Sequence, residues 1–237
     1  ILGAGLIGGS LALGLREQGA ASIALWARSE RNRQAARNLG FTDIFEEPTA
    51  AVRQADVVVF CTPVPPVAEL GQRLVQHLPA DCVITDAGST KADAVRALQP
   101  LFGARYVGAH PIAGSEQSGM DAARGDLFHS APCILTPVPE TPAPTVEAID
   151  SFWQRVGCRT ARMSPEAHDA LLARISHLPH LVASTLVGVV TRGDPTVQSF
   201  AGGGYRDTTR VASGSASLWT EILLSNRRET AVAIREL

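Results

Sequence analysis

The chain has 237 residues, of which 45% are hydrophobic and 19% are charged. This composition supports a sizeable buried core and excludes an intrinsically disordered chain. The formal net charge of −2 provides no general attraction to nucleic acid or to an anionic membrane surface, so we expect neither as a partner.

The cysteines are far apart and form no CxxC or Cys/His pattern of a metal site. A reducing cytoplasm is therefore the simplest location. The most apolar long segment, at 181–190, is interrupted by polar residues and glycine, and no apolar stretch approaches the roughly 18 residues of a membrane span. Because Ile1 is not a methionine and already lies inside the first motif, we expect the natural N-terminus to lie further upstream. The cysteines are Cys61, Cys82, Cys133 and Cys158.

Short apolar runs alternate with amphipathic segments through the first two thirds of the chain. The runs are strand-length and rich in valine and isoleucine, whereas the segments between them fit helices. This alternation predicts an α/β fold, a Rossmann-like doubly wound and mostly parallel sheet with helices on both faces. The predicted strands are 22–27, 56–62, 82–88, 106–110 and 131–137, and the predicted helices are 6–18, 30–39, 48–54, 67–78 and 91–99.

The character of the sequence changes near Ser164. The proline-rich stretch at 137–144 is followed by one more helix and one more strand, so we do not place a domain boundary there. After Ser164 comes one long helical pattern, interrupted near Pro179, and then helix-like segments with glycine loops. We therefore expect a dinucleotide-binding domain over 1–164 and a smaller all-α domain over 165–237.

The chain opens on a GxGxxG spacing that directly follows two apolar residues and begins an apolar helix. Such glycines permit a tight turn and a close approach of the backbone to a pyrophosphate, which the helix N-terminus attracts. A structural glycine turn is the alternative, but the strand-before, helix-after context favours nucleotide binding. The residues that we expect to contact the cofactor are Gly3, Gly5, Leu6, Ile7 and Gly8, with Cys61, Thr62 and Pro63.

The residues near position 28 bear on cofactor choice. About 20 residues beyond the last glycine, an NAD-preferring site usually carries Asp or Glu for the ribose hydroxyls. This chain has Arg28 there, with Ser29 beside it and Arg31 close by. An arginine pairs well with a 2′-phosphate, although a solvent-facing basic loop would have the same composition. We favour NADP over NAD and leave dual use open.

Three further polar clusters stand out along the chain. Ser89 follows the predicted strand that contains Asp86, where it would line a ligand site, although a role as a helix N-cap would also explain it. The stretch "GAHPIAGSEQSG" at 108–119 contributes polar side chains at the end of the next strand. In the last cluster, Asp207 and Arg210 could simply form a surface i,i+3 ion pair.

The histidines admit three kinds of chemistry. His177 and His180 could share a helix face as metal ligands, but Pro179 disturbs that face and no third ligand has a fixed spacing, so we predict no metal. A nucleophilic site would lack the GxSxG elbow. With a nicotinamide cofactor, a strand-end His110 is best explained as a general base that removes a hydroxyl proton, and Arg210 as the partner of a carboxylate.

Taken together, six motifs resemble those of the prephenate/arogenate dehydrogenases of tyrosine biosynthesis. The motifs are "GLIGGSLA", "DAGSTK", "GAHPIAGSEQSG", "LF…CILTP", "SPEAHD…ISHLPH" and "GGGYRDTTR", and they occur in the family's order over nearly the whole chain. The glycine fingerprint is common to many dehydrogenases, whereas "HPIAGSE", "SHLPH" and "GGGYRDTTR" are far more diagnostic.

The resemblance implies an oxidative decarboxylation of prephenate to 4-hydroxyphenylpyruvate, with hydride passing to NAD(P)+ and CO2 leaving as the ring aromatises. It implies that His110 accepts the hydroxyl proton while Ser89 helps to orient the base. It also implies a homodimer built on the α domain. The helix at 171–190 agrees with this, because it carries apolar side chains on more faces than a small domain alone could bury. Substrate-side roles are implied for Arg210, His180, His177, Ser115, Glu116, Asp207, Gly203 and Trp219.

Two other functions remain open. One is a dehydrogenase that takes arogenate, the amino-acid form of the substrate, although "GSEQSG" and the second histidine of "SHLPH" favour prephenate. The other is a non-catalytic NADP-sensing module, which His110, Ser89 and Arg210 together argue against. His168 and Asp169 match the family's "HD" pair, and we interpret them first as capping and interface features.

Overall fold

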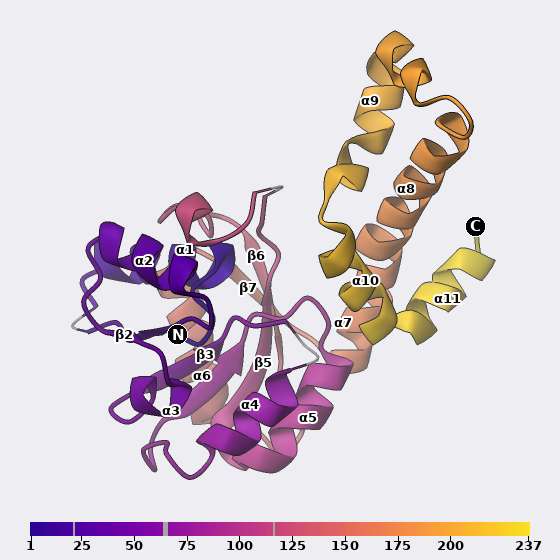
Figure 1. Ribbon diagram of the computed structural model, residues 1–237. Helices are drawn as coiled ribbons and strands as arrows, with labels where there is room; N and C mark the ends of the chain where they lie inside the picture. The colour runs from indigo at the N-terminus through magenta and orange to yellow at the C-terminus, as the bar shows by residue number, and fades with distance from the viewer. Residues whose placement is uncertain (21, 64–65, 116) are drawn as a thin grey trace. The chain divides into compact units, whose positions relative to one another are not determined.

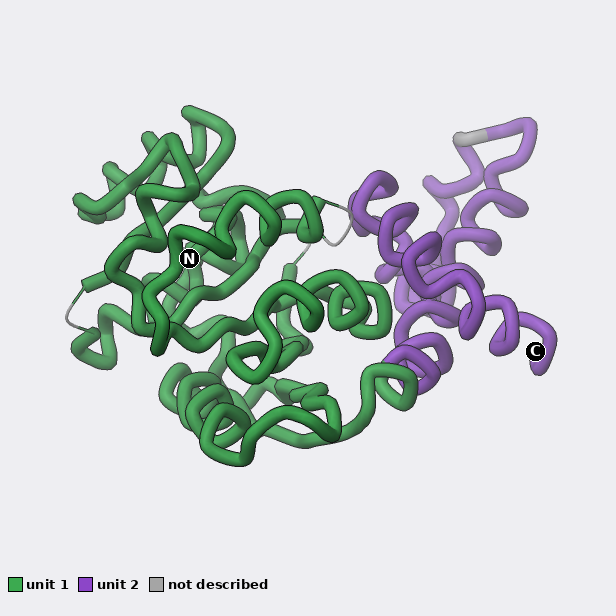
Figure 2. Tube along the Cα trace, turned by 90° about the horizontal axis from the view of Figure 1, so that it is seen from below, with its two compact units in different colours: residues 1–168 green, residues 169–237 purple. Residues whose placement is uncertain are grey.

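The computed structural model describes residues 1–237 except 21, 64–65 and 116. The chain divides into two compact units, Ile1–His168 and Asp169–Leu237, which Figure 2 distinguishes by colour. The division falls within helix α7 (Pro165–Leu172). Each unit is described by itself below.

The first unit contains a mostly parallel sheet in the strand order β3-β4-β5-β6-β7 (Figure 1). Among the strands described, only the pairing of β5 with β6 is antiparallel. A parallel pair, β1-β2, continues the sheet, because Leu2 bridges Trp26 on one side and Phe60 on the other. The strands are β1 (Leu25–Trp26), β2 (Ile44–Phe45), β3 (Val57–Phe60), β4 (Val83–Asp86), β5 (Tyr106–Pro111), β6 (Pro132–Thr136) and β7 (Arg159–Arg162).

Helices cover both faces of this sheet because side chains alternate along each buried strand. Val58 and Phe60 pack with Ile84 against α4 and α5. Val59 and Val107 lie in a second core with α1 and α6. The helices of this unit are α1 (Leu6–Glu17), α2 (Glu30–Asn38), α3 (Pro48–Ala51), α4 (Val67–Leu74), α5 (Ala92–Phe102) and α6 (Ala143–Arg155). The fold class expected from the sequence is therefore confirmed.

All the secondary structure among the described residues of the second unit is helical. After α7, a five-residue π-helix spans Ala173–His177 and leads into α8 (Leu178–Val190). The interruption that we expected near Pro179 thus lies just before it. Pro179 is the second residue of α8, directly after the π-helix, so the helical run continues through this proline. The remaining helices are α9 (Gly203–Thr209), α10 (Ala216–Ser225) and α11 (Arg227–Arg235), with short 3-10 turns at Pro195–Phe200 and Arg210–Ser213.

The helical run Pro165–Val190 is 26 residues long, and an 18-residue window within it has a mean hydropathy of 1.2. By length and composition alone it could cross a membrane, so our expectation that no segment is long enough was wrong. The sequence argument looked for an unbroken apolar stretch, whereas the continuous helix tolerates scattered polar residues. Its most apolar window is only 28% buried within the chain, which leaves an apolar surface for another contact.

Candidate active site

The turn at the start of α1 requires glycine at two positions. Gly3 has φ +110°, and a Cβ there would lie 2.7 Å from the carbonyl oxygen of Cys61. A Cβ on Gly8 would lie 2.2 Å from the carbonyl oxygen of Gly3. A Cβ on Gly5, in contrast, would meet nothing within 4 Å. The backbone is therefore tightly packed at Gly3 and Gly8, whereas the space beside Gly5 is open.

This open space suits a pyrophosphate group. Gly5 is the N-cap of α1 and provides no side-chain cap, so the first helical N–H groups, including those of Leu6 and Ile7, are not used by a capping side chain. Nearby, the Thr62 hydroxyl is buried without a hydrogen-bond partner among the described residues, and Pro63 beside it is exposed. Burial raises the pKa of the Cys61 thiol to about 12, which keeps it neutral. These residues fit a dinucleotide cofactor.

The loop after β1 is basic, and its arginines differ in whether another side chain already pairs with them. Ser29 caps α2 through its side chain, and Arg33 is held by two backbone carbonyls and by acidic side chains. Arg31 forms an exposed ion pair with Asp121 at 3.2 Å. Arg28 is exposed and has no ion-pair partner among the residues described. Of the arginines predicted to contact the cofactor, Arg28 is thus the more available to a phosphate.

A buried ion pair joins the ends of two central strands. Asp86, the last residue of β4, pairs with Lys91, and both side chains are almost fully buried. The Asp86 carboxylate also accepts hydrogen bonds from the Tyr106 hydroxyl at 2.8 Å and from the backbone N–H groups of Ala109 at 3.2 Å and Gly88 at 2.9 Å. Lys91 Nζ donates to the Ala109 carbonyl at 2.7 Å. The ion pair therefore binds both the backbone N–H and the backbone carbonyl of Ala109 in β5.

The two residues expected to do the chemistry flank this network. Ser89 is half-buried in the loop between Asp86 and Lys91, and His110 directly follows Ala109. Since α5 begins at Ala92, the N-cap position belongs to Lys91, and Ser89 is not the helix cap that we considered. Burial, with the charge of Asp86, raises the pKa of Tyr106 well above its usual value.

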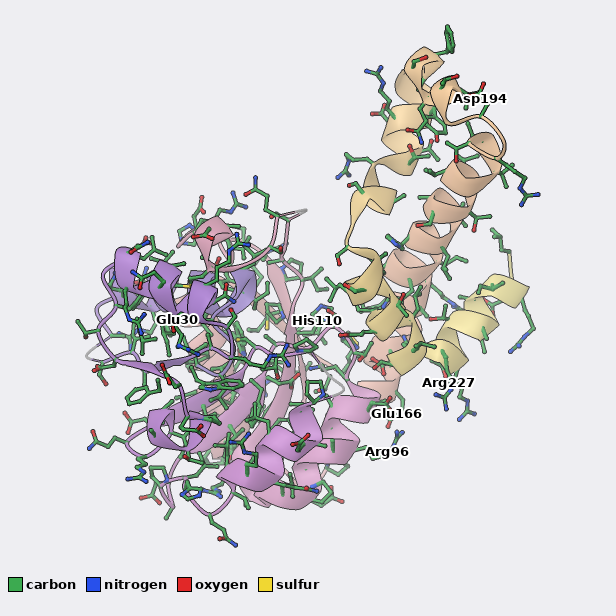
Figure 3. All side chains as sticks on the ribbon, viewed as in Figure 1. Glu30, Arg96, His110, Glu166, Asp194 and Arg227 are labelled. Carbon is green, nitrogen blue, oxygen red and sulfur yellow. The ribbon has the colours of Figure 1, made fainter. Side chains whose placement is uncertain are left out.

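His110 lies within β5, opposite Ile134 of β6. The proline that follows favours an extended backbone at this histidine, as a strand requires. The side chain is 9% exposed, and Figure 3 shows it within the first unit. Its Nδ1 lies 2.8 Å from Nε2 of His168, a fully buried side chain in α7. The two rings meet edge to face, with centroids 5.0 Å apart.

The loop after β5 contains two further predicted residues. Ser115 is exposed, and its hydroxyl accepts a hydrogen bond from the backbone N–H of Gln117 at 3.0 Å. Glu116 lies outside the described residues.

In the second unit, three predicted residues form one cluster. The ring of His180 stacks on Trp219 with centroids 3.6 Å apart, and His177 meets the same indole edge-on at 6.3 Å. His180 Nδ1 is buried and has no hydrogen-bond partner among the described residues. Burial lowers the pKa of His180, against a smaller opposing effect of the Val211 backbone, and thereby favours the neutral ring.

The glycine-rich motif of the second unit is largely exposed. Gly203 begins α9, Asp207 lies in its last turn, and Arg210 begins the 3-10 turn that packs on α8. Among the described residues neither Asp207 nor Arg210 forms a salt bridge, so the surface ion pair that we considered is not formed. Within the same residues no cluster of three or more His, Cys, Asp or Glu side chains could hold a metal ion.

Sequence reasoning missed Lys91 and the contact between His110 and His168. The spacing of Asp86 and Lys91 in "DAGSTK" was the available signal, but a lysine beside a glycine turn is normally exposed. For His168, the sequence carried no indication of its partner, because 58 residues separate the two histidines.

The fold and the glycine turn together define a dinucleotide-binding domain, which a helical domain follows in the chain. The nucleotide-binding domain of prephenate dehydrogenases matches residues 11–162, and the dimerization domain of the same enzymes matches residues 164–236. The chain belongs to the prephenate dehydrogenase family and is an NAD(P)-dependent oxidoreductase.

Relatives of known sequence agree with this assignment. The chain is 37% identical to a cyclohexadienyl dehydrogenase of Zymomonas mobilis, over 95% of this chain and 80% of that protein. It is 38% identical to a prephenate dehydrogenase of Bacillus subtilis, over 96% of this chain but only 63% of that protein. The chain thus spans less than two thirds of the Bacillus enzyme.

Solved structures agree as well. A prephenate dehydrogenase of Aquifex aeolicus, solved with hydroxyphenyl propionate and NAD+, superposes with a TM-score of 0.92 at 33% identity, covering 99% of this chain and 84% of that one. An arogenate dehydrogenase of Synechocystis superposes with a TM-score of 0.83 at 29% identity, over 99% of this chain and 86% of that one.

Proposed function

We propose that the chain catalyses the oxidative decarboxylation of prephenate to 4-hydroxyphenylpyruvate and CO2, with reduction of a nicotinamide dinucleotide. The observation that carries this proposal is the buried His110, held on β5 beside the Ser89 loop in the sheet that bears the glycine turn. The names of the relatives support the choice of substrate.

The protein's part in the reaction is to remove a proton and to fix the ring. The bound nicotinamide supplies the hydride acceptor. His110 takes the proton of the substrate hydroxyl, which raises the electron density at the carbon that loses hydride. Ser89 orients that hydroxyl and the imidazole. Aromatisation of the ring provides driving force, so precise positioning is the main requirement.

The substrate's carboxylates need cationic and hydrogen-bonding partners. We assign one carboxylate to Arg210, which is exposed and unpaired among the described residues. His180 suits a polar substrate group, because its buried Nδ1 otherwise lacks a partner. The other residues that we assign to the substrate side are His177, Ser115, Glu116, Asp207, Gly203 and Trp219.

For the cofactor we propose NADP in preference to NAD, because Arg28 occupies the position near the ribose and is available to a 2′-phosphate. We further propose a cytoplasmic homodimer that associates through residues 165–237, with residues 1–164 as the dinucleotide-binding domain. The match to a dimerization domain supports the association.

Arogenate is the second candidate substrate, supported by the similarity to the Synechocystis arogenate dehydrogenase. One assay separates the candidates: reduced-cofactor absorbance is followed with prephenate and with arogenate, each against NAD and NADP. We expect the highest kcat/KM for prephenate with NADP, and a large loss of kcat in His110→Ala with cofactor affinity retained. A wild-type protein that binds NADP but oxidises neither compound would refute the proposal and favour a cofactor-sensing module.

A further inference from the structure

The ring nitrogens of His110 and His168 are joined by a hydrogen bond inside the first unit. Nδ1 of His110 and Nε2 of His168 are 2.8 Å apart, and the contact is buried. Two imidazole nitrogens at this distance share one proton, so one ring donates and the other accepts. Which ring donates determines whether His110 can act as a base.

Only one of the two arrangements suits proton removal through Nε2. If His168 donated, Nδ1 of His110 would be the acceptor and the proton of a neutral His110 ring would reside on Nε2. If His110 donates through Nδ1–H, its Nε2 carries the lone pair that a general base requires. When His110 then gains a proton, Nδ1–H still faces an acceptor, which favours the imidazolium form.

We propose that His168 is a positioning residue for His110: its Nε2 accepts the Nδ1–H hydrogen bond and thereby selects the ring orientation and the tautomer of the base. His168 suits this task because its side chain is fully buried, so water does not readily replace it as an acceptor. It also lies in helix α7, where its backbone N–H donates to the Ser164 carbonyl at 3.0 Å, so its position is set by secondary structure. The catalytic part of this inference rests on the proposed function.

The competing explanation is that His168 only fills space behind His110. Two substitutions separate the explanations. Leu at position 168 keeps most of the volume but offers no acceptor, which leaves Nδ1–H of His110 without its partner and favours the other tautomer. Gln places a carbonyl oxygen near the site of Nε2 and restores an acceptor, so a positioning role predicts rescue by His168→Gln and a packing role does not.

Kinetics and NMR of the full-length protein provide the test. We expect His168→Leu to lower kcat by about 10- to 100-fold, by analogy with the range found for residues that orient metal-ligating histidines, with little change in KM. His168→Gln should recover most of kcat, and His77→Gln, at an exposed histidine outside the site, serves as the control. Thermal unfolding and cofactor binding of each variant show whether it is folded.

The tautomer is measured independently of activity. In protein labelled with 15N-histidine, the ring signals that disappear in His110→Ala belong to His110. We expect them to report protonation at Nδ1 in the wild type and in His168→Gln, and at Nε2 in His168→Leu. Protonation at Nε2 in the wild type, or equal losses of kcat in folded Leu and Gln variants, would overturn the inference. If the wild type oxidises neither prephenate nor arogenate, the proposed function fails, while the ring signals still decide the tautomer.

Discussion

Arg28 and Arg210 are exposed arginines without ion-pair partners among the described residues, and we assign them to different ligands. Arg28 follows β1 in the dinucleotide-binding unit, whereas Arg210 lies in the helical unit. Substitution of each should therefore affect a different kinetic constant, even though the chemical change is the same.

Replacing Arg28 with Gln removes the charge offered to a 2′-phosphate. We expect kcat/KM for NADP to fall by about tenfold, which corresponds to about 1.4 kcal/mol, while kcat/KM for NAD changes little. Steady-state kinetics with both cofactors measures the effect, and Arg53→Gln, at an exposed residue after α3, is the control. Equal losses with the two cofactors would contradict this role.

Replacing Arg210 with Gln removes the partner of a substrate carboxylate. Because a charge-assisted hydrogen bond contributes about 1.5–3 kcal/mol, we expect KM for prephenate to rise by about 10- to 100-fold, with cofactor affinity unchanged. Arg228→Gln, at an exposed residue of α11, provides a matched loss of charge in the same unit. A normal KM in Arg210→Gln would remove this residue from the substrate site.

At the scale of elements, the Asp86–Lys91 pair connects the end of β4, the loop before α5 and the strand β5. Tyr106 completes the network from the first position of β5. Its pKa is raised in the folded state by burial first and by the charge of Asp86 second. The neutral phenol thus stabilises the fold as long as it remains protonated.

This linkage makes alkaline stability sensitive to Tyr106. Since the folded-state pKa lies above the unfolded value of about 10, the stabilisation is complete below that pH and is lost as the pH rises toward the folded pKa, by up to about 1.4 kcal/mol per pH unit. At pH 8, Tyr106→Phe should lower the free energy of unfolding by about 1–3 kcal/mol, because buried Asp86 loses a donor. The gap to the wild type should narrow above pH 10.

Urea unfolding at pH 8 and pH 10.5 tests this prediction. Tyr205→Phe, the same chemical change outside the Asp86 network, is the control. A gap between wild type and Tyr106→Phe that stays constant with pH would show that the phenol does not titrate as described.

Much of the fold could be predicted from the sequence, because strands that are buried on both faces have a recognisable apolar pattern. The central strands β3 and β4 are buried on both faces, so they appear as continuous apolar runs. The two-residue strand β2 is half-buried and leaves no such run, and it was not predicted. The π-helix at Ala173–His177 was not predicted either, because its altered hydrogen bonding has no counterpart in composition.

The candidate active site likewise contains features that the sequence predicted and features that it did not. His110 ends one predicted strand and Ser89 directly follows another, so their neighbourhood was inferred from topology alone. The burial of Lys91 depends on its contacts with Asp86 and Ala109 from two different strands, and the contact of His110 with His168 depends on tertiary packing. Neither leaves a periodic pattern in the local sequence.

At the scale of the whole molecule, apolar side chains on the helical unit remain exposed. These side chains lie in the part of the chain that matches a dimerization domain, which supports our proposal of a homodimer. These exposed residues include Ile175, Val182, Val189, Val190, Leu218 and Leu224.

We expect light scattering to show a dimer at micromolar concentration. Val189→Asp introduces a charge on this apolar surface and should shift the equilibrium toward monomer by at least about tenfold in Kd, since an unpaired charge in an interface costs more than about 1.4 kcal/mol. Gln198→Asp, at an exposed polar position of the same unit, should leave the mass unchanged. A wild-type monomer would refute the proposal.

The buried ion pair also constrains how this sequence can diverge. Loss of either Asp86 or Lys91 alone would deprive the other buried charge of this ion-pair partner, at a cost of about 3–5 kcal/mol, against a total stability of about 5–15 kcal/mol for a typical domain. A neutral, apolar replacement of both residues could be tolerated, but each single-step route to it passes through a poorly folded intermediate. Random mutagenesis under selection should therefore leave both positions unchanged far more often than their neighbours in the same loop.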